Sequence, residues 1–295
     1  MLGEARALGA TGIRVMPVAL GCGALGESRL SEGDVDALLG AALDEGVTLL
    51  DTARGYGASE ERIGRSLGAR REQIVLSTKG GYGVDGVADW TALAIERGID
   101  DALRRLRTDR IDVFHLHSCP LETLRRDDIL GALDHARASG KIRVAAYSGE
   151  NDALAWAAAS ERFGSVQCSV NVFDQWSARS TLRAAVARGV GVLAKRPLAN
   201  APWRFAERPH GEYAETYWER MRAMAFDPSP LAWHEVALRY SAYAPGVAAI
   251  LVGTSSAAHL KADVRLFEKG PLPAEVIGAL EARFDQHGAA WRGEV

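Results

Sequence analysis

The sequence predicts an α/β fold: a single (β/α)8 TIM barrel over residues 1–295, with an N-terminal β-hairpin and a C-terminal helix. Short apolar segments alternate with segments of helical periodicity, which is typical of parallel βαβ units. Three successive strand-like segments end in polar residues, at Asp51, Lys79 and His117. A barrel of about 250 residues accounts for most of a chain of 295 residues, so no second domain is expected.

The expected strands are short apolar runs. Before them, Leu8–Val15 is typical of a small hairpin whose turn is supplied by Gly9 to Gly12. Eight strands can then be counted along the chain, and this number matches a closed barrel. They are Pro17–Gly21, Val47–Leu50, Ile74–Lys79, Ile111–His117, Val144–Tyr147, Val166–Val170, Val190–Ala194 and Ala248–Val252.

The expected helices follow the strands and are bounded by capping residues. Ser31 and Asp34 resemble a capping box with a shortened acid, and Gly46 ends that first helix. Ser59 is expected to cap the next helix, Glu60–Leu67. The later helices are expected at Ala92–Leu106, Thr123–Ser139, Ala153–Ser160, Arg179–Arg188, Leu231–Tyr243, His259–Phe267 and Ala274–His287.

Two segments do not fit the alternation. Leu198–Pro230 is long, contains four prolines and several aromatic residues, and is expected to be an irregular binding loop or lid. The tail Gly288–Val295 leaves little chain to close over a site, although Trp291 is able to reach one. Six aromatic residues are candidates for an apolar substrate pocket, or equally for core or surface positions: Tyr82, Trp90, Phe173, Trp176, Trp203 and Phe205.

The polar strand ends are the candidate functional residues. Asp51 ends the second strand, and Tyr56 follows it in a loop flanked by glycines. Lys79 and His117 end the next two barrel strands. Because the carboxyl ends of barrel strands meet at one mouth, where barrel enzymes carry their chemistry, we expect these four side chains to converge.

The joint motif resembles the aldo-keto reductase family. It reads Asp-Thr-Ala-x-x-Tyr-Gly-x-Ser-Glu, then Ser-Thr-Lys, then Asp-x-x-x-x-His, and the likeness runs from about Leu20 to Asp263. The resemblance implies an NAD(P)H-dependent oxidoreductase that reduces aldehydes or ketones, or oxidises the corresponding alcohols or sugars. It also implies that Tyr56 donates the proton, that Lys79 and Asp51 form the ion pair that tunes it, and that His117 orients the carbonyl.

Elementary chemistry supports these implied roles. No side chain donates hydride, so a nicotinamide must bind. A free tyrosine has a pKa of about 10, and a neighbouring ammonium favours the phenolate. Taken singly, Asp51 and Lys79 are equally well explained as a structural ion pair, and His117 as a core histidine. The combined spacing favours the catalytic interpretation.

The resemblance also implies the cofactor contacts near the nicotinamide. Gly23 and Ala24, after the first strand, are expected to approach the cofactor, or alternatively to form a tight turn. Ser148 and Gln167 lie where the family binds the carboxamide, with Asp51 beside them. Gly149 stands where the family has an asparagine, so one contact is missing or is supplied by Asn151. Asn171 is expected either to contact ligand or to cap a turn.

The remaining cofactor contacts depart from the family. Lys195-Arg196-Pro-Leu198 stands in place of the usual Tyr-Ser-Pro-Leu, so the tyrosine that stacks on the nicotinamide is absent. The planar guanidinium of Arg196 is expected to replace part of that stacking, or else Lys195 or Arg196 contacts the pyrophosphate. On the adenosine side the resemblance implies contacts from Gly253, Thr254, Ser255, His259 and Asp263, and it favours NADP(H) over NAD(H). The alternative there is a simple N-capped helix.

Two rival functions share these residues. His115 and His117 suggest a metal-dependent hydrolase, but the other histidines lie on expected helices or the long loop, so no metal is expected. His115 is expected to point into the barrel packing. A nucleotide-binding regulatory subunit of the same fold, with little turnover, is the second alternative.

The composition limits the kinds of partner that the protein is expected to bind. A net charge of −3 argues against nucleic acid or an anionic membrane, and no run approaches the roughly 18 apolar residues of a membrane span. The first residues show no signal-peptide pattern, and three widely spaced cysteines suggest no disulfide framework. We expect a cytoplasmic protein, a monomer or small homo-oligomer, that acts on a small molecule.

Overall fold

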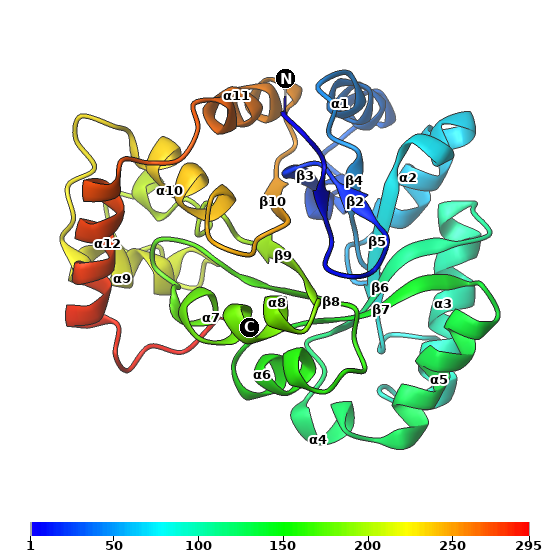
Figure 1. Ribbon diagram of the computed structural model, residues 1–295. Helices are drawn as coiled ribbons and strands as arrows, with labels where there is room; N and C mark the ends of the chain where they lie inside the picture. Colours follow the sequence, from blue (N-terminus) through cyan, green and yellow to red (C-terminus); the bar gives the residue numbers. More distant parts are fainter. Residues whose placement is uncertain (1, 295) are drawn as a thin grey trace.

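The computed structural model describes residues 2–294 and contains the expected barrel (Figure 1). Eight parallel strands close on themselves in the order β10-β3-β4-β5-β6-β7-β8-β9. The (β/α)8 fold is therefore confirmed. The strands are β3 (Val18–Gly21), β4 (Leu49–Asp51), β5 (Val75–Gly80), β6 (Ile111–His117), β7 (Ile142–Ser148), β8 (Ser165–Ser169), β9 (Gly191–Lys195) and β10 (Ala249–Gly253).

Helices surround the barrel, and their apolar faces pack on the outward residues of the strands. The α-helices are α1 (Glu32–Asp44), α2 (Ser59–Leu67), α3 (Ala92–Leu106), α4 (Leu121–Leu124), α5 (Asp127–Ala138), α6 (Asn151–Ala159), α7 (Trp176–Arg179), α8 (Thr181–Ala187), α9 (Glu215–Met224), α10 (Trp233–Ala242), α11 (Ala257–Glu268) and α12 (Ala274–His287). Three short 3-10 helices are η1 (Gly23–Gly26), η2 (Gly68–Gln73) and η3 (Pro202–Arg204).

The N-terminal hairpin closes the amino end of the barrel. It pairs β1 (Arg6–Ala7) with β2 (Arg14–Val15), and its apolar residues pack among the inward residues of the barrel strands. Gly9 in its turn has φ +57°, and a Cβ there would lie 2.2 Å from the carbonyl oxygen of Gly189. Only glycine fits this contact between hairpin and barrel.

Two expected helices are each interrupted in the structure. The helix expected at Thr123–Ser139 is divided into α4 and α5, because Arg126 between them is extended at ψ 132°. Asp127 and Asp128 then begin α5, where acidic residues favour a new helix start. The helix expected at Arg179–Arg188 is divided at Ser180, whose hydroxyl donates to the carbonyl of Trp176 and competes with the helical ladder.

The segment 198–230 is more regular than expected. It contains η3 and the ten-residue helix α9, which the sequence analysis missed. Tyr217 and Met224 on α9 are fully buried in a cluster with residues of α10 and α12, beside the barrel at the left of Figure 1. This second small core anchors the segment, so most of it is a packed extension and not an open loop.

Serine has two different roles at the first two helix starts. Ser31 forms the expected capping box with Asp34. The expectation for Ser59 is wrong: Ala58 occupies the N-cap of α2, and the hydroxyl of Ser59 donates to the carbonyl of Cys22 at 2.8 Å. Ser59 also accepts from Thr52 at 2.8 Å, so it ties together the loops after β3 and β4.

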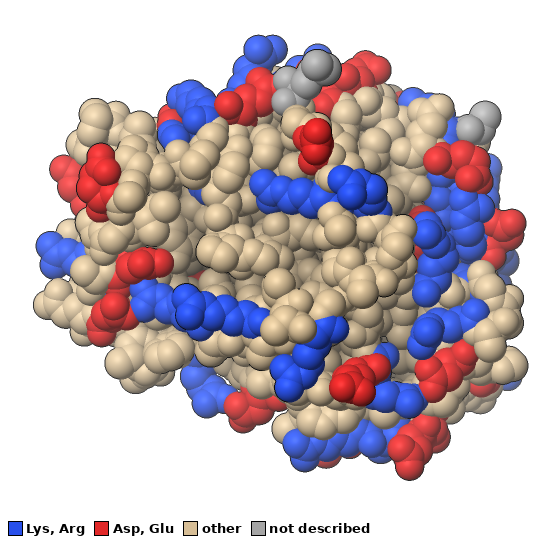
Figure 2. All heavy atoms as spheres, viewed as in Figure 1, with Lys and Arg blue, Asp and Glu red and all other residues tan. Residues whose placement is uncertain are grey.

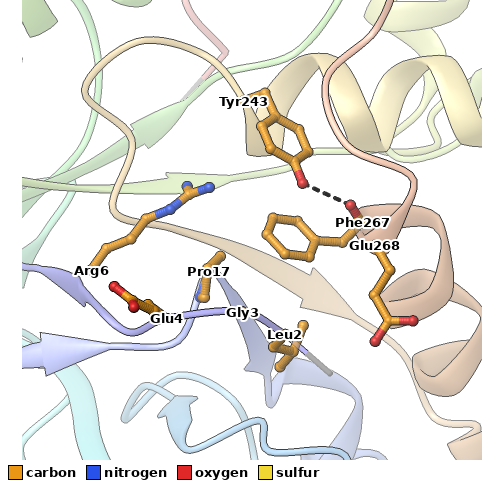
Figure 3. Close-up of a pocket in the computed structure, with 8 residues that line it drawn as sticks. All are labelled: Leu2, Gly3, Glu4, Arg6, Pro17, Tyr243, Phe267 and Glu268. Atoms are coloured by element: carbon orange, nitrogen blue, oxygen red, sulfur yellow. Dashed lines mark hydrogen bonds between the residues drawn. The ribbon is translucent and has the colours of Figure 1, made fainter.

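The face of the molecule seen in Figure 2 carries charged side chains of both signs. On the face seen in Figure 2, basic and acidic side chains are interspersed around a central uncharged area. Cavities of about 410 and 390 Å³ lie at the amino end of the barrel. In the first, Arg6 extends over the rings of Tyr243 and Phe267 (Figure 3). Within residues 2–294, no helix is long and apolar enough to cross a membrane.

Candidate active site

The carboxyl ends of the strands carry the polar residues, and their side chains point into the barrel mouth. Leu49 and Leu193 lie inside the barrel, in an inner hydrophobic cluster that also contains the apolar residues of the hairpin. Their neighbours Leu50 and Ala194 point outward and pack in the cluster that contains the helices. Because strand side chains alternate, residues two positions after an inward residue also point inward. Asp51, Lys79, His117, Ser148, Gln167 and Lys195 therefore face a common mouth.

Four expected residues meet in this mouth. The ammonium of Lys79 donates to Asp51 Oδ2 at 2.6 Å, to the carbonyl of Thr52 at 2.9 Å and to the hydroxyl of Tyr56 at 3.4 Å. The rings of Tyr56 and His117 meet edge to face with centroids 5.9 Å apart. Tyr56 and His117 remain partly accessible, whereas Asp51 and Lys79 are buried. The arrangement places a hydroxyl and an imidazole toward the mouth, with an ion pair behind them.

Asp51 is the centre of a buried network. Its Oδ1 accepts from Ser77 at 2.7 Å and from the side-chain amide of Gln167 at 2.9 Å, and Ser148 donates to Gln167 at 3.1 Å. Burial opposes ionisation of Asp51, but the Lys79 ammonium and the hydrogen bonds from Lys79 and Ser77 are among the causes that together lower the pKa of the carboxyl. Burial also favours the neutral form of Lys79, but the pKa of its ammonium is nevertheless raised, chiefly by the Asp51 carboxylate. Both charges are therefore stable at neutral pH.

The two histidines of β6 are neutral. Burial, assisted by Lys79, lowers the pKa of His117 to about 3, and burial lowers that of His115 to about 4. His115 is fully buried inside the barrel, as expected, and its Nδ1 lies 3.4 Å from Ser77 Oγ. Across residues 2–294 no group of three or more His, Cys, Asp or Glu side chains is placed to hold a metal ion.

Tyr82 fixes the orientation of His117. Its hydroxyl lies 2.8 Å from Nδ1 of His117, and the two rings stack with centroids 5.7 Å apart. When the phenol donates to Nδ1, the neutral imidazole carries its proton on Nε2, which leaves a donor for the mouth. Trp90 packs against Tyr82 with centroids 5.7 Å apart, so these two aromatic residues belong to the site.

The other aromatic candidates lie elsewhere. Phe173 is fully buried in the cluster beside α9, and Trp203 stacks on Trp233 at the same cluster. Trp176 packs on Phe284 of α12, and Phe205 lies under the guanidinium of Arg204. For Phe173, Trp176 and Trp203 the core or surface alternative is therefore the observed one.

Glycines leave room at one side of the mouth. Gly21 and Gly253 are register partners at the ends of β3 and β10, and a Cβ on Gly253 would meet no atom within 4 Å. Gly23 and Ala24 lie in η1, where a Cβ on Gly23 would lie 3.9 Å from the Tyr56 ring. Backbone here is open to close approach by a ligand, which fits the cofactor that the resemblance implies.

Gly149 is explained by Tyr147. A Cβ at Gly149 would lie 2.2 Å from the hydroxyl of Tyr147, which is buried and donates to the carbonyl of Cys119 at 3.2 Å. A side chain fits at this position only if the Tyr147 ring moves. Asn151 does not substitute for the missing asparagine, because its amide group is engaged by the backbone of Gly293 in two hydrogen bonds.

A Gly149→Ala protein is expected to be less stable than the wild type by about 1–3 kcal/mol, because the methyl group overpacks against the Tyr147 ring. Urea denaturation measures the difference. Gly131→Ala is the matched control, since a Cβ there meets nothing within 4 Å in the middle of α5, and this change is expected to be neutral or stabilising. Equal stability of the Gly149→Ala protein and the wild type would contradict the expectation.

Lys195 has a partner that the sequence analysis missed. Glu150 follows β7, and its Oε1 lies 3.3 Å from the Lys195 ammonium and accepts from the backbone N–H of Ser169 at 2.7 Å. Arg196 donates to Ser169 Oγ at 3.3 Å and to the carbonyl of Glu294. The side chain of Asn171 stabilises a turn, since its Oδ1 accepts a hydrogen bond from the N–H of Phe173. Leu198 is partly buried and packs against the hydrophobic cluster that contains residues of α9.

The C-terminal tail reaches farther than expected. Figure 1 shows it leaving α12 and running back toward the barrel. Asn151 binds Gly293, Asp174 accepts from Glu294 N–H at 3.3 Å, and Arg220 donates to the carbonyl of Arg292 at 2.6 Å. Trp291 packs on Phe284. The tail thus lies over the loops that follow β7, β8 and β9, next to the mouth.

The start of α11 is an N-capped helix. Ser256, next to the expected Thr254 and Ser255, accepts from the N–H of His259 and caps the helix. His259 is exposed. Asp263 is buried and pairs with His234 of α10, so its side chain is directed at the neighbouring helix.

The chain is similar to proteins of one family over most of its length. Residues 17–283 match the model of the Aldo/keto reductase family. YqkF, an uncharacterized oxidoreductase of Bacillus subtilis, is 27% identical over 95% of this chain and 96% of its own. L-galactose dehydrogenase of Arabidopsis thaliana is 28% identical over 88% of this chain and 87% of its own. The solved holo form of aldo-keto reductase AKR11C1 from Bacillus halodurans is 27% identical with a TM-score of 0.82, and the match covers 95% of this chain and 96% of that one.

Proposed function

Because the chain belongs to the aldo/keto reductase family and is an NAD(P)H-dependent oxidoreductase, we propose that Tyr56 is the proton donor with which it reduces aldehydes or ketones of small molecules. The observation that carries this proposal is the contact of one buried ammonium, that of Lys79, with both Asp51 Oδ2 and the Tyr56 hydroxyl. A tyrosine that must release and regain a proton needs a nearby fixed cation, and Asp51 fixes this one.

Each of the four residues has a separate role at the substrate carbonyl. When bound, the reduced nicotinamide supplies the hydride, which no side chain donates. Tyr56 gives its proton to the carbonyl oxygen as charge develops there, and Lys79 stabilises the phenolate that remains. His117, neutral and held at Nδ1 by Tyr82, donates from Nε2 to the same oxygen and so orients the substrate.

Several residues at the mouth are suited to hold the cofactor. Ser148 and Gln167 present a hydroxyl and an amide next to Asp51, which matches a carboxamide. Gly23 and Ala24 can contact the cofactor through their backbone atoms, and the unfilled space around Gly253 leaves room for it beside them. Thr254, Ser255 and the exposed His259 lie at the start of α11, where a phosphate is favoured. We expect NADP(H) to bind more tightly than NAD(H).

The substrate side is formed by Tyr82 and Trp90 beside His117. An aromatic wall next to a hydrogen-bond donor suits a small carbonyl compound with an apolar part, or the apolar face of a sugar. One relative is named as a dehydrogenase of L-galactose, so sugars belong in the substrate panel together with simple aldehydes and ketones.

The first experiment titrates NADPH and NADH separately, following the quenching of protein fluorescence. Tight binding of NADPH, with weaker binding of NADH, is the expected result. Oxidation of the bound nucleotide is then followed with a panel of aldehydes, ketones and sugar-derived carbonyls. Failure to bind either nucleotide would overturn the proposal, and binding without turnover on any carbonyl would favour the regulatory alternative.

A further inference from the structure

Lys195 is an inward-pointing cation at the rim of the same mouth. It ends β9 and pairs in register with Ser169, two residues beyond Gln167 on β8. Leu193, two residues earlier, packs in the inner cluster, so the Lys195 side chain also points inward. The barrel mouth therefore contains two lysines, of which only Lys79 takes part in the proposed proton transfer.

The charge of Lys195 is oriented by Glu150. The Glu150 side chain is 0% exposed, whereas that of Lys195 is 16% exposed. Glu150 is held from behind by Ser169 N–H at 2.7 Å and is covered by Gly293 of the tail. The carboxylate therefore lies beneath the ammonium, and the positive end of the pair faces the mouth.

The field of Lys195 reaches the proposed catalytic groups. After burial and Lys79, Lys195 is the next charge that lowers the pKa of His117, and it acts in the same direction on His115. An ammonium that influences two imidazoles of β6 across the barrel also acts on any ligand that lies between β6 and β9.

We propose that Lys195, held by Glu150, makes this site bind the reduced nicotinamide more tightly than the oxidised one. This inference rests on the proposed function and adds a specificity residue to it. The oxidised ring carries one positive charge and the reduced ring carries none, so a fixed ammonium in the mouth repels only the oxidised form. The pair thereby favours uptake of the reduced nucleotide and release of the oxidised one.

The test compares dissociation constants of the two redox forms. NADPH is titrated by fluorescence, and NADP⁺ by its displacement of NADPH; NADH and NAD⁺ serve if that nucleotide binds more tightly. In the wild type the ratio of the oxidised to the reduced dissociation constant is expected to exceed one. In Lys195→Met this ratio falls by about tenfold, whereas Lys195→Arg preserves it.

Two further variants keep the test decisive. Lys195→Met with Glu150→Gln removes both charges, leaves no unpaired buried carboxylate, and is expected to lower the ratio as the single variant does. Lys269→Met is the matched control, because Lys269 pairs with Glu235 at 2.7 Å on the outer helices and its loss leaves the ratio unchanged. NADPH binding with an unaltered ratio in both Lys195→Met proteins overturns this inference alone. Absence of nucleotide binding in the wild type overturns the proposed function and this inference with it.

Discussion

In the Tyr56→Phe protein, turnover is expected to fall by roughly 10²- to 10⁴-fold while nucleotide affinity stays unchanged. The substitution removes only the hydroxyl that lies 3.4 Å from the Lys79 ammonium, and the ring keeps its contact with His117. The carbonyl oxygen then has no acid placed to protonate it. Steady-state rates and a parallel fluorescence titration separate the loss of chemistry from any loss of binding.

Tyr243→Phe is the matched control for this experiment. It also removes a partly buried tyrosine hydroxyl, which donates to the carbonyl of Phe267 at 2.8 Å, but it does so at the amino end of the barrel. Its turnover is expected to equal that of the wild type. A Tyr56→Phe protein with wild-type turnover would remove Tyr56 from the mechanism.

The Asp51→Asn protein is expected to lose about 3–5 kcal/mol of folding free energy together with its turnover. Lys79 is 1% exposed, and its carboxylate partner lies only 2.6 Å away. Asparagine still accepts from Ser77, but it leaves a buried ammonium without a counter-charge. Urea denaturation measures the loss of stability, and the reductase assay measures the loss of activity.

Adding Lys79→Met to Asp51→Asn distinguishes the structural role of the pair from its chemical role. The double variant has no unpaired charge, so most of the lost stability is expected to return. Turnover is not expected to return, because no cation remains beside Tyr56. A double variant that is no more stable than Asp51→Asn alone would show that the buried charge is not the cause.

The barrel and its mouth are largely predictable from sequence because they depend on local patterns. Strand alternation fixes which residues point inward, so Asp51 and Lys79 on adjacent strands must lie close together. The paired capping residues Ser31 and Asp34 are likewise local and were predicted. The local helix-capping rule fails for Ser59, because its hydroxyl donates a hydrogen bond to the carbonyl of Cys22, which is distant in the sequence.

The missed features depend on contacts between segments far apart in the chain. Glu150 lies in a loop, and only the fold shows that it meets Lys195. Helix α9 has a weak pattern among four prolines, and its burial depends on α10 and α12. The reach of the tail depends on Asn151, which is 142 residues away from Gly293.

The close approach of Tyr147 to Gly149 also restricts how this sequence can evolve. A side chain at position 149 forces the Tyr147 ring to move, since the hydroxyl fills the space that its Cβ needs. An asparagine at 149 is therefore expected to cost less stability when a smaller residue has replaced Tyr147.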